Sequence, residues 1–370
     1  MKYKVLVVGA FRSREFGVLG GIARSCDELI ASEFVERFDV SMVDSTQRAN
    51  PPPNVFARGW FAAFRQVKFI VKLARYRPDC VLLFFSSGMS FYEKALMGWL
   101  AKFFGAKVFL FPRAGALMTM GYRSKIGRIV QRSLFQCGDV FLAQGLQWQN
   151  YAVEICRYPK GRTYIVPNWT GSDEYYALGS ARMRNMREKV SPTLAFVGWL
   201  EAEKGVRELL MACAMLAKSG LQFSCVLAGD GTQKMWVEEF IEHYKLGGVV
   251  TLKGWLNGSE LTDHYRNADI FVLPSWNEGM PNSLIEAMSS GLCPVVTSVG
   301  NIPDFVRNGE HGLVIEPNSA EALYDALSIL ITTPSLQLEY SRAAYELSKQ
   351  FDKNYVIPLL CDIIETNLPN

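Results

Sequence analysis

Two series of alternating strand-like and helix-like segments constrain the fold of this 370-residue chain most strongly. Short apolar runs, typical of buried parallel strands, are followed by segments with helical spacing. In the first half the strand-like runs are residues 4–8, 38–43, 79–85, 107–111 and 139–143. Such alternation predicts an α/β fold with parallel sheets, because a crossover between parallel strands usually contains a helix. The length favours two domains rather than one.

The second series begins after a charged segment, residues 173–189, that we expect to be an irregular link. Strand-like runs follow at 193–198, 223–231 (with a turn), 249–256, 268–273, 295–297 and 312–315. We therefore expect one Rossmann-like domain over residues 1–168 and a second over residues 169–352.

Composition limits the class of protein. Hydrophobic residues make up 49% and charged residues 20%, as in globular proteins with a large core. The net charge of +3 gives no reason to expect a nucleic-acid partner. Eight scattered cysteines without a Cys-x-x-Cys pair fit a reducing compartment. The first residues indicate a strand and not a signal peptide, so we expect a cytoplasmic protein.

Residues 274–294 link an apolar strand-like run to a short helix that closes at Gly291. Ligands of open α/β sheets bind in such loops, beyond the carboxyl ends of strands. Backbone N–H groups of Met280, Asn282 and Ser283 can converge there on an anion, aided by the helix dipole. Gly279 keeps the approach free of a side chain.

Two carboxylates, Glu278 and Glu286, flank this helix start. A carboxylate accepts hydrogen bonds from neighbouring hydroxyls, which suits a sugar or a ribose. The alternative is a capping box formed by Ser283 and Glu286, with Glu278 a solvated loop residue. The register of Glu278, Gly279 and Pro281 with the following Gly-Leu-Cys-Pro-Val-Val favours a ligand site.

The pattern Glu278-Gly-x-Pro-x-x-x-x-Glu286-Ala-Met-x-x-Gly-x-Pro-Val-Val resembles the Glu-x7-Glu signature of retaining glycosyltransferases of family 4. That family has the GT-B fold, two Rossmann-like domains facing a central cleft. The resemblance implies that the first domain binds the acceptor and the second the donor. It also implies that a C-terminal helix, about 353–370, packs back on the first domain. Glu278 would hold the donor sugar and Glu286 the ribose. The backbone of Gly279, Met280, Pro281, Asn282, Ser283 and Leu284 would line the donor site.

A second element, Gly198-Trp199-Leu-Glu-Ala-Glu-Lys204-Gly205, is similar to the family's Gly-Arg-Leu-x-x-x-Lys-Gly. In the family the Arg and the Lys hold the donor diphosphate. Lys204 is present, whereas Trp199 occupies the position of the Arg. A lysine near a helix start is mildly unfavourable, which itself indicates an anionic ligand. Arg207 either supplies the missing charge or lies on a solvated helix face.

The first domain carries two further candidates. Gly20 and Gly21 follow the first strand; alone they indicate a turn, and in the family such a pair abuts the donor diphosphate. The family usually has a histidine after the strand at 107–112, where this chain has Arg113. Arg113 would hold an anionic donor sugar, an acceptor phosphate or the diphosphate. A structural salt bridge is the alternative.

Residues 58–77 form an amphipathic helix by spacing, with basic residues on one face and apolar residues on the other. The basic face comprises Arg65, Lys68, Lys72 and Arg75, and the apolar face Trp60, Phe64, Val67, Ile70, Val71 and Ala74. We expect the apolar face to be buried on the sheet and the basic face to contact an anionic membrane, at the inner face of the membrane for a cytoplasmic protein. The alternative is that the basic face is solvated. Lys125, Arg128 and Arg132 add a second basic patch.

The expected function is that of a nucleotide-sugar-dependent retaining glycosyltransferase. It would move a hexose from a UDP- or GDP-sugar to a hydroxyl of a glycan or lipid-linked glycan, as in surface polysaccharide biosynthesis. The sequence has no Asp-x-Asp pair, so we expect neither a metal nor a cofactor. The alternatives are a non-catalytic glycosyltransferase-like partner protein and a GT-B nucleotide-sugar epimerase.

Overall fold

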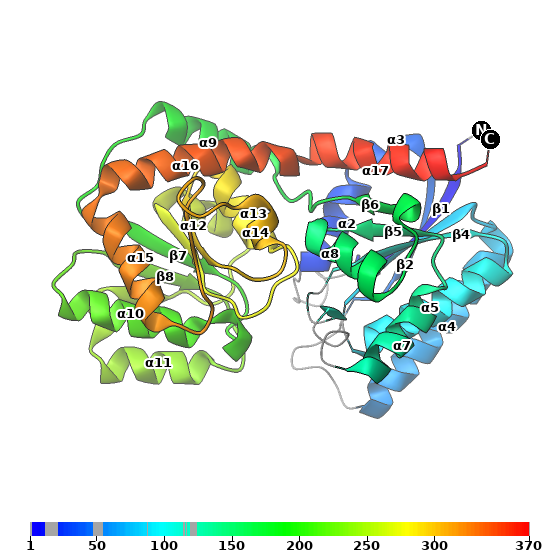
Figure 1. Ribbon diagram of the computed structural model, residues 1–370, viewed down its shortest axis with the longest axis horizontal. Coiled ribbons are helices and arrows are strands. Elements are labelled where there is room, and N and C mark those ends of the chain that lie inside the picture. The colour runs from blue at the N-terminus through cyan, green and yellow to red at the C-terminus, as the bar shows by residue number, and fades with distance from the viewer. Residues whose placement is uncertain are drawn as a thin grey trace. The chain divides into compact units, whose positions relative to one another are not determined.

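The computed structural model describes residues 2–11, 21–46, 55–86, 88–113, 115, 117–118 and 124–369. The chain divides into two compact units (Figure 1). The first unit contains residues 1–170 and 353–370, and the second contains residues 171–352. The sequence placed this boundary between residues 168 and 169.

The sheet of the first unit has six parallel strands in the order β2-β1-β3-β4-β5-β6. The strands are β1 (Lys4–Gly9), β2 (Asp39–Asp44), β3 (Cys80–Phe85), β4 (Lys107–Pro112), β5 (Val140–Ala143) and β6 (Thr163–Ile165). The helices are α2 (Gly21–Ile30), α3 (Phe34–Arg37), α4 (Val55–Tyr76), α5 (Met89–Phe103), α7 (Lys125–Phe135), α8 (Leu146–Asn150) and α17 (Lys353–Asn367). Three short helical turns, Tyr151–Ile155, Lys160–Arg162 and Lys349–Phe351, adjoin these elements or those of the second unit.

Helices cover both faces of this sheet because neighbouring residues of a strand point to opposite faces. Leu6 and Val8 pack in one cluster with residues of α4, α5 and α7. Val5 and Val7 pack in another with residues of α2, α3 and α17. Arg37 of α3 fixes α17 with hydrogen bonds of 2.6 Å to Glu365 and 2.7 Å to Asp362. The C-terminal helix is therefore part of the first unit.

The sheet of the second unit also has six parallel strands, in the order β12-β11-β10-β7-β8-β9. The strands are β7 (Thr193–Val197), β8 (Ser224–Ala228), β9 (Val250–Leu252), β10 (Ile270–Leu273), β11 (Cys293–Thr297) and β12 (Leu313–Ile315). The helices are α9 (Asp173–Arg184), α10 (Val206–Lys218), α11 (Lys234–His243), α12 (Ser259–Asn267), α13 (Asn282–Ser289), α14 (Ile302–Phe305), α15 (Ala320–Thr332) and α16 (Pro334–Ser348). Short turns of 3-10 helix lie at Ala202–Lys204 and Leu246–Gly248.

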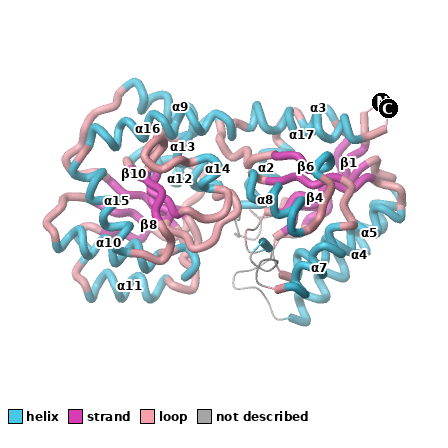
Figure 2. Tube along the Cα trace, viewed as in Figure 1, coloured by secondary structure: helices cyan, strands magenta, loops and turns pink. Residues whose placement is uncertain are grey.

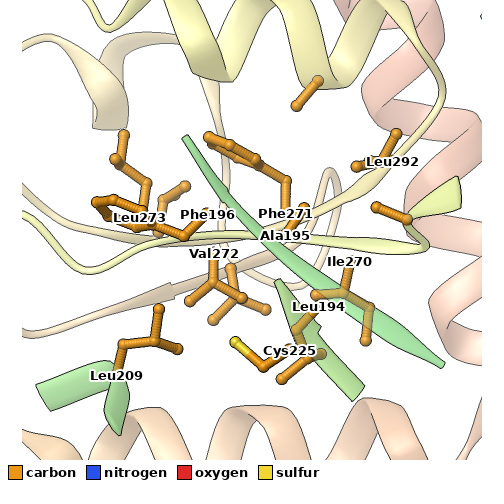
Figure 3. Packing of buried hydrophobic residues seen from close by; sticks show 14 of the residues in the cluster. Leu194, Ala195, Phe196, Leu209, Cys225, Ile270, Phe271, Val272, Leu273 and Leu292 are labelled. Atoms are coloured by element: carbon orange, nitrogen blue, oxygen red, sulfur yellow. The ribbon is translucent and has the colours of Figure 1, made fainter. Parts of the chain in front are cut away.

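If β7 is numbered 1 and the sheet is read from β9 to β12, the strand order is 3-2-1-4-5-6, which is the doubly wound order. In this order strands 1 to 3 extend toward one edge of the sheet and strands 4 to 6 toward the other, so the direction reverses between the first and fourth strands. Those strands are β7 and β10, which pair in parallel. Their apolar side chains, among them Leu194, Phe196, Ile270 and Val272, form the centre of the core (Figure 3). The strands lie inside each unit with helices outside (Figure 2).

One expectation for the link between domains is wrong. Residues 173–189 do not form an irregular link, because Asp173–Arg184 is helix α9. Tyr175 of α9 is buried in the second core, and the Arg182 guanidinium donates to the carbonyls of Tyr265, Ala268 and Ser290. These tertiary contacts stabilise a helix whose polar sequence shows little apolar periodicity.

The predicted orientation of the 58–77 helix is also wrong. The face expected to be buried is exposed, with Trp60 74% and Val67 58% accessible. Phe69 and Leu73 face the core instead and are fully buried. Two of the residues assigned to the basic face hold the helix to its unit. Arg65 bonds to Glu93 at 2.7 Å, and Lys72 bonds to Ser41 at 2.8 Å. Because α4 carries apolar residues on more than one side, its spacing alone could not select the buried side.

Candidate functional site

Lys204 and Glu278 follow the two central strands of the second unit. Lys204 closes the short turn after β7, and Glu278 lies in the loop after β10. Since β7 and β10 are parallel neighbours, both loops leave the same edge of the sheet. This is the point at which the strand order reverses, where open α/β sheets bind ligands.

The structure joins these two side chains in an ion pair. The Lys204 ammonium lies 2.7 Å from Glu278 Oε1, and the Ser275 hydroxyl donates to the same oxygen at 2.8 Å. The Glu278 side chain is only 9% exposed. Burial disfavours the charged ammonium, but the charge of Glu278 and its hydrogen bond outweigh this, so the pKa of Lys204 is raised. Lys204 therefore remains a cation at neutral pH.

Backbone packing fixes the position of both loops. Gly205 has φ +68°, and a Cβ there would lie 2.0 Å from the carbonyl oxygen of Pro274. Only glycine allows this approach. The Trp276 N–H also donates to the Glu203 carbonyl at 2.8 Å. On the other side, a Cβ at Gly300 would lie 2.1 Å from the carbonyl oxygen of Glu278. The ion pair is thus held by the main chain on both sides.

Glu286 lies in α13 and is 3% exposed. Its Oε2 accepts a hydrogen bond of 3.0 Å from the Tyr265 hydroxyl. The helix begins at Asn282, its N-cap is Pro281, and no side chain caps it. The alternative of a capping box between Ser283 and Glu286 is therefore wrong.

The remaining residues of the 278–284 stretch line the start of α13. Gly279, Met280, Pro281 and Leu284 are buried, whereas Asn282 and Ser283 are half-buried. The first N–H groups of a helix have no partner within the helix and can bind an anion. This end of α13 follows directly on Glu278.

Gly198 and Trp199 follow β7. A Cβ at Gly229 would lie 1.9 Å from the carbonyl oxygen of Gly198. The backbone after β8 therefore passes very close to the backbone after β7. The Trp199 ring packs against Trp255, with centroids 4.5 Å apart and an angle of 37° between the rings. The position at which the resembling family has an arginine is therefore part of an aromatic pair.

Arg207 does not join the Lys204–Glu278 pair. Its Nε donates to Gln233 at 3.0 Å, and its guanidinium lies 4.7 Å from the ring centroid of Trp236 on α11. Both contacts hold the side chain along the outer surface of α10 and α11. The structure thus gives no support for Arg207 as the replacement for the missing arginine.

In the first unit, Gly20 lies outside the described residues, and Gly21 is the first residue of α2. Arg113 follows β4 and donates to the Ser25 hydroxyl at 2.5 Å. Its guanidinium also lies 4.7 Å from the Phe111 ring centroid and 5.1 Å from that of Trp169.

Among the residues that the structure describes, no carboxylate lies within ion-pair distance of Arg113. Its Nη1 is buried and has no hydrogen-bond partner in this part of the chain. Burial lowers the pKa of Arg113 to about 9, which leaves the side chain charged at neutral pH. The alternative of a salt bridge is not seen in the described part of the chain. A buried cation without a counter-ion can hold an anionic group.

Several residues of the site were not predicted. Ser275 could have been predicted as a partner of Glu278, because it lies three residues before Glu278 in the same loop. Tyr265 could not have been predicted as a partner of Glu286, because it precedes Glu286 by 21 residues and lies on a separate helix. In the described ranges, no group of three or more His, Cys, Asp or Glu side chains could hold a metal ion. None of the helices described here is long and apolar enough to cross a membrane.

Comparison with known proteins places the sequence similarity in the second unit. Residues 182–347 match the family described as glycosyl transferases group 1. The putative colanic acid biosynthesis glycosyltransferase WcaL of Salmonella typhimurium is 30% identical over 179 residues, 46% of this chain and 44% of that protein. The chain thus matches less than half the length of this curated relative.

Solved structures resemble the chain over nearly its whole length. Sucrose-phosphate synthase from Thermosynechococcus elongatus has a TM-score of 0.76 at 17% identity and covers 99% of both chains. HepE from Anabaena, solved in complex with UDP, has a TM-score of 0.73 at 14% identity and covers 99% of this chain and 100% of its own. At such identities the likeness shows the fold alone. The fold is GT-B with two Rossmann-like domains, and the family match lies within the second of them.

Proposed function

We propose that the protein is a retaining glycosyltransferase of family 4, which transfers a hexose from a UDP- or GDP-sugar to a hydroxyl of a glycan or lipid-linked glycan. The observation that carries this proposal is the Lys204–Glu278 pair at the point where the strand order reverses. A nucleoside diphosphate sugar offers an anion for Lys204 and hydroxyls for Glu278.

Donor binding would rearrange this pair. Among described residues both hydrogen bonds to the Glu278 carboxylate reach Oε1, so Oε2 is the oxygen for a sugar hydroxyl. The diphosphate would take up part of the charge of Lys204, and the first N–H groups of α13 would bind the sugar and phosphate oxygens. Glu286 would accept from the ribose, with Tyr265 fixing the carboxylate.

The transfer itself would depend on position and charge. The bond between the anomeric carbon and the phosphate oxygen breaks while the acceptor oxygen attacks from the same face of the sugar. The departing phosphate oxygen takes the acceptor proton, so no protein base is required. Lys204 and the α13 amides would stabilise the negative charge on the diphosphate. No metal is needed for this step.

The first unit would bind the acceptor. Arg113 would hold an anionic group of the donor or acceptor, since it is charged and its Nη1 lacks a partner in the described part of the unit. The names of similar proteins support a role in polysaccharide synthesis. They include WcaL and the putative teichuronic acid biosynthesis glycosyltransferase TuaC of Bacillus subtilis. We place the reaction in the cytoplasm.

The Trp199–Trp255 pair favours a second candidate, a non-catalytic partner protein. Trp199 replaces a cation that the resembling enzymes use to bind diphosphate. A non-catalytic protein would retain the fold and lose donor affinity.

A donor screen tests the proposal. The thermal stability of the full chain is measured with UDP-, GDP- and ADP-sugars, because a ligand that binds the folded state stabilises it by RT ln(1 + [L]/Kd). Each donor that stabilises the protein is then incubated with the protein in the presence and in the absence of a glycan fraction from cell extract. The nucleotide released in the two reactions is compared. Acceptor-dependent release supports the enzyme. No stabilisation by any nucleotide or nucleotide sugar supports the partner protein.

A further inference from the structure

Three neighbouring helices of the first unit, α4, α5 and α7, expose apolar stripes. They cover one face of the sheet, α4 beside α5 and α5 beside α7 (Figure 1). On the outer side of each helix the exposed apolar residues include Trp60, Phe64, Val67 and Val71 on α4, Tyr92, Leu96, Trp99 and Phe103 on α5, and Ile126 and Ile129 on α7. Spacings of three and four residues place each set on one side of its helix. We call these residues the three-helix surface.

These side chains are not part of the hydrophobic core. Phe69, Leu73, Phe91 and Phe135 of the same helices fill the core and are buried. On the opposite side Phe103 is 86%, Ile126 75% and Trp60 74% exposed. Single exposed apolar residues are common, but a contiguous apolar patch marks an interaction surface.

The charge around the patch has one sign. Neither α4 nor α7 contains an acidic residue. The one acidic residue of α5, Glu93, has a side chain only 9% exposed and is paired with Arg65 at 2.7 Å and Lys94 at 3.2 Å. Lys68, Arg75 and Lys125 are exposed. The three helices therefore offer cations and no exposed carboxylate to a partner.

Cations also lie directly beside the exposed rings. The Lys68 ammonium is 4.5 Å from the Phe64 ring centroid, and the Lys102 ammonium is 5.7 Å from that of Trp99. Aromatic rings next to lysines are typical of protein surfaces at the boundary between lipid headgroups and acyl chains. The ring enters the apolar layer, while the long lysine stem keeps its charge at the headgroups.

We propose that the three-helix surface binds the surface of an anionic lipid bilayer. The helices would lie in the plane of the membrane, with Trp60, Trp99 and Phe103 at the level of the acyl boundary and the basic residues at the phosphates. A second copy of the chain fits less well, because a symmetric dimer through this surface would bring like charges together. The inference does not need a donor or transfer activity, so it can fail or hold independently of the proposed function.

Flotation with lipid vesicles tests the proposal on the full chain at low salt. One vesicle set is phosphatidylcholine and the other also contains phosphatidylglycerol. We expect binding to the anionic set that falls as salt is added. The apolar variant is Trp60→Ser with Phe103→Ser, and its control is Val190→Ser with Met235→Ser, at exposed apolar residues of the second unit. The charge variant is Lys68→Gln with Arg75→Gln, and its control is Lys160→Gln with Lys218→Gln, at exposed residues off the surface.

We expect the charge variant to bind up to about 25-fold more weakly than wild type, at roughly fivefold for each basic residue near the membrane. The apolar variant should lose most binding, and both controls should bind like wild type. Thermal melting verifies that each variant is folded. The proposal is overturned if wild type fails to bind anionic vesicles, binds neutral vesicles equally well, or is unaffected by the apolar variant. A second result also overturns it. In that case wild type does not bind vesicles but forms a dimer, and the dimer dissociates in the variant Trp60→Ser with Phe103→Ser.

Discussion

Lys204 and Glu278 are 74 residues apart in sequence, yet the Lys204 ammonium lies 2.7 Å from Glu278 Oε1. Their loops follow β7 and β10, the two strands between which the sheet order reverses. The contact is therefore a direct result of the topology. It also means that a change at either residue affects both ligand binding and the buried pair.

Lys204→Ala should weaken binding of UDP and GDP by roughly 1.5–3 kcal/mol, the contribution of a hydrogen bond to a charged group. Binding of the monophosphates should weaken less, because the lost contact is to the outer phosphate. Calorimetric titration of di- and monophosphates measures the difference. Lys218→Ala, at an exposed lysine that ends α10 in the same unit, serves as control. Equal losses for di- and monophosphates would contradict the assignment of Lys204.

Glu278→Gln should abolish transfer and leave most nucleotide affinity intact. The amide keeps the size of the side chain but loses a charged acceptor for sugar hydroxyls and the ion pair with Lys204. Steady-state transfer assays and UDP titration measure the two effects separately. Transfer within a few-fold of wild type would rule out the role proposed for Glu278.

Transfer should continue in EDTA, because Lys204 and the helix amides are proposed to neutralise the diphosphate. The measurement compares initial rates before and after chelation, with Mg²⁺ and Mn²⁺ added back. Activity that disappears in EDTA and returns with either ion would show that a metal takes part.

Much of the candidate site could be proposed from short sequence stretches. Glu278, Gly279 and Pro281 lie within one loop, so their spacing carried the signal without any knowledge of packing. Lys204 was predicted in the same way, from its place before Gly205. The reason for that glycine, a close approach to the Pro274 carbonyl, needed the structure.

Contacts between distant segments could not be predicted. The pairing of Tyr265 with Glu286 and of Trp199 with Trp255 depends on how separate loops meet at one edge of the sheet. The predicted orientation of α4 was wrong for a different reason. Phe69 and Leu73 are only two of its many apolar residues, and the sheet contact selects them over the wider stripe around Trp60 and Val67.

The stability of the second unit should fall as the pH drops from 7 to 5. Burial, with a smaller effect of Lys253, lowers the pKa of His264 to about 4. Between that value and the ordinary pKa near 6.5 the unfolded chain binds a proton that the folded chain does not, so stability is present above this range and lost within it. The loss from this residue is about 2 kcal/mol at pH 5.

Urea unfolding of wild type, His264→Gln and the exposed control His243→Gln at the two pH values measures this effect. The His264 variant should show a smaller pH dependence than wild type, while the control keeps it. An unchanged pH dependence in His264→Gln would show that another group is responsible.

The Trp199 position decides between the enzyme and the partner protein. Trp199 packs on Trp255 at 4.5 Å, so Trp199→Arg and Trp199→Leu should both lose about 0.5–1.5 kcal/mol of stability from the ring pair. Only Trp199→Arg adds a cation beyond β7, in the loop that contains Lys204, and we expect it to bind UDP or GDP about tenfold more tightly than Trp199→Leu. Titration of wild type and both variants gives the answer. Diphosphate binding by wild type that depends on Lys204 supports an enzyme in which one cation suffices. If wild type binds no nucleotide and Trp199→Arg does, the aromatic pair has replaced the diphosphate contact, and the chain is a partner protein with the fold of an enzyme.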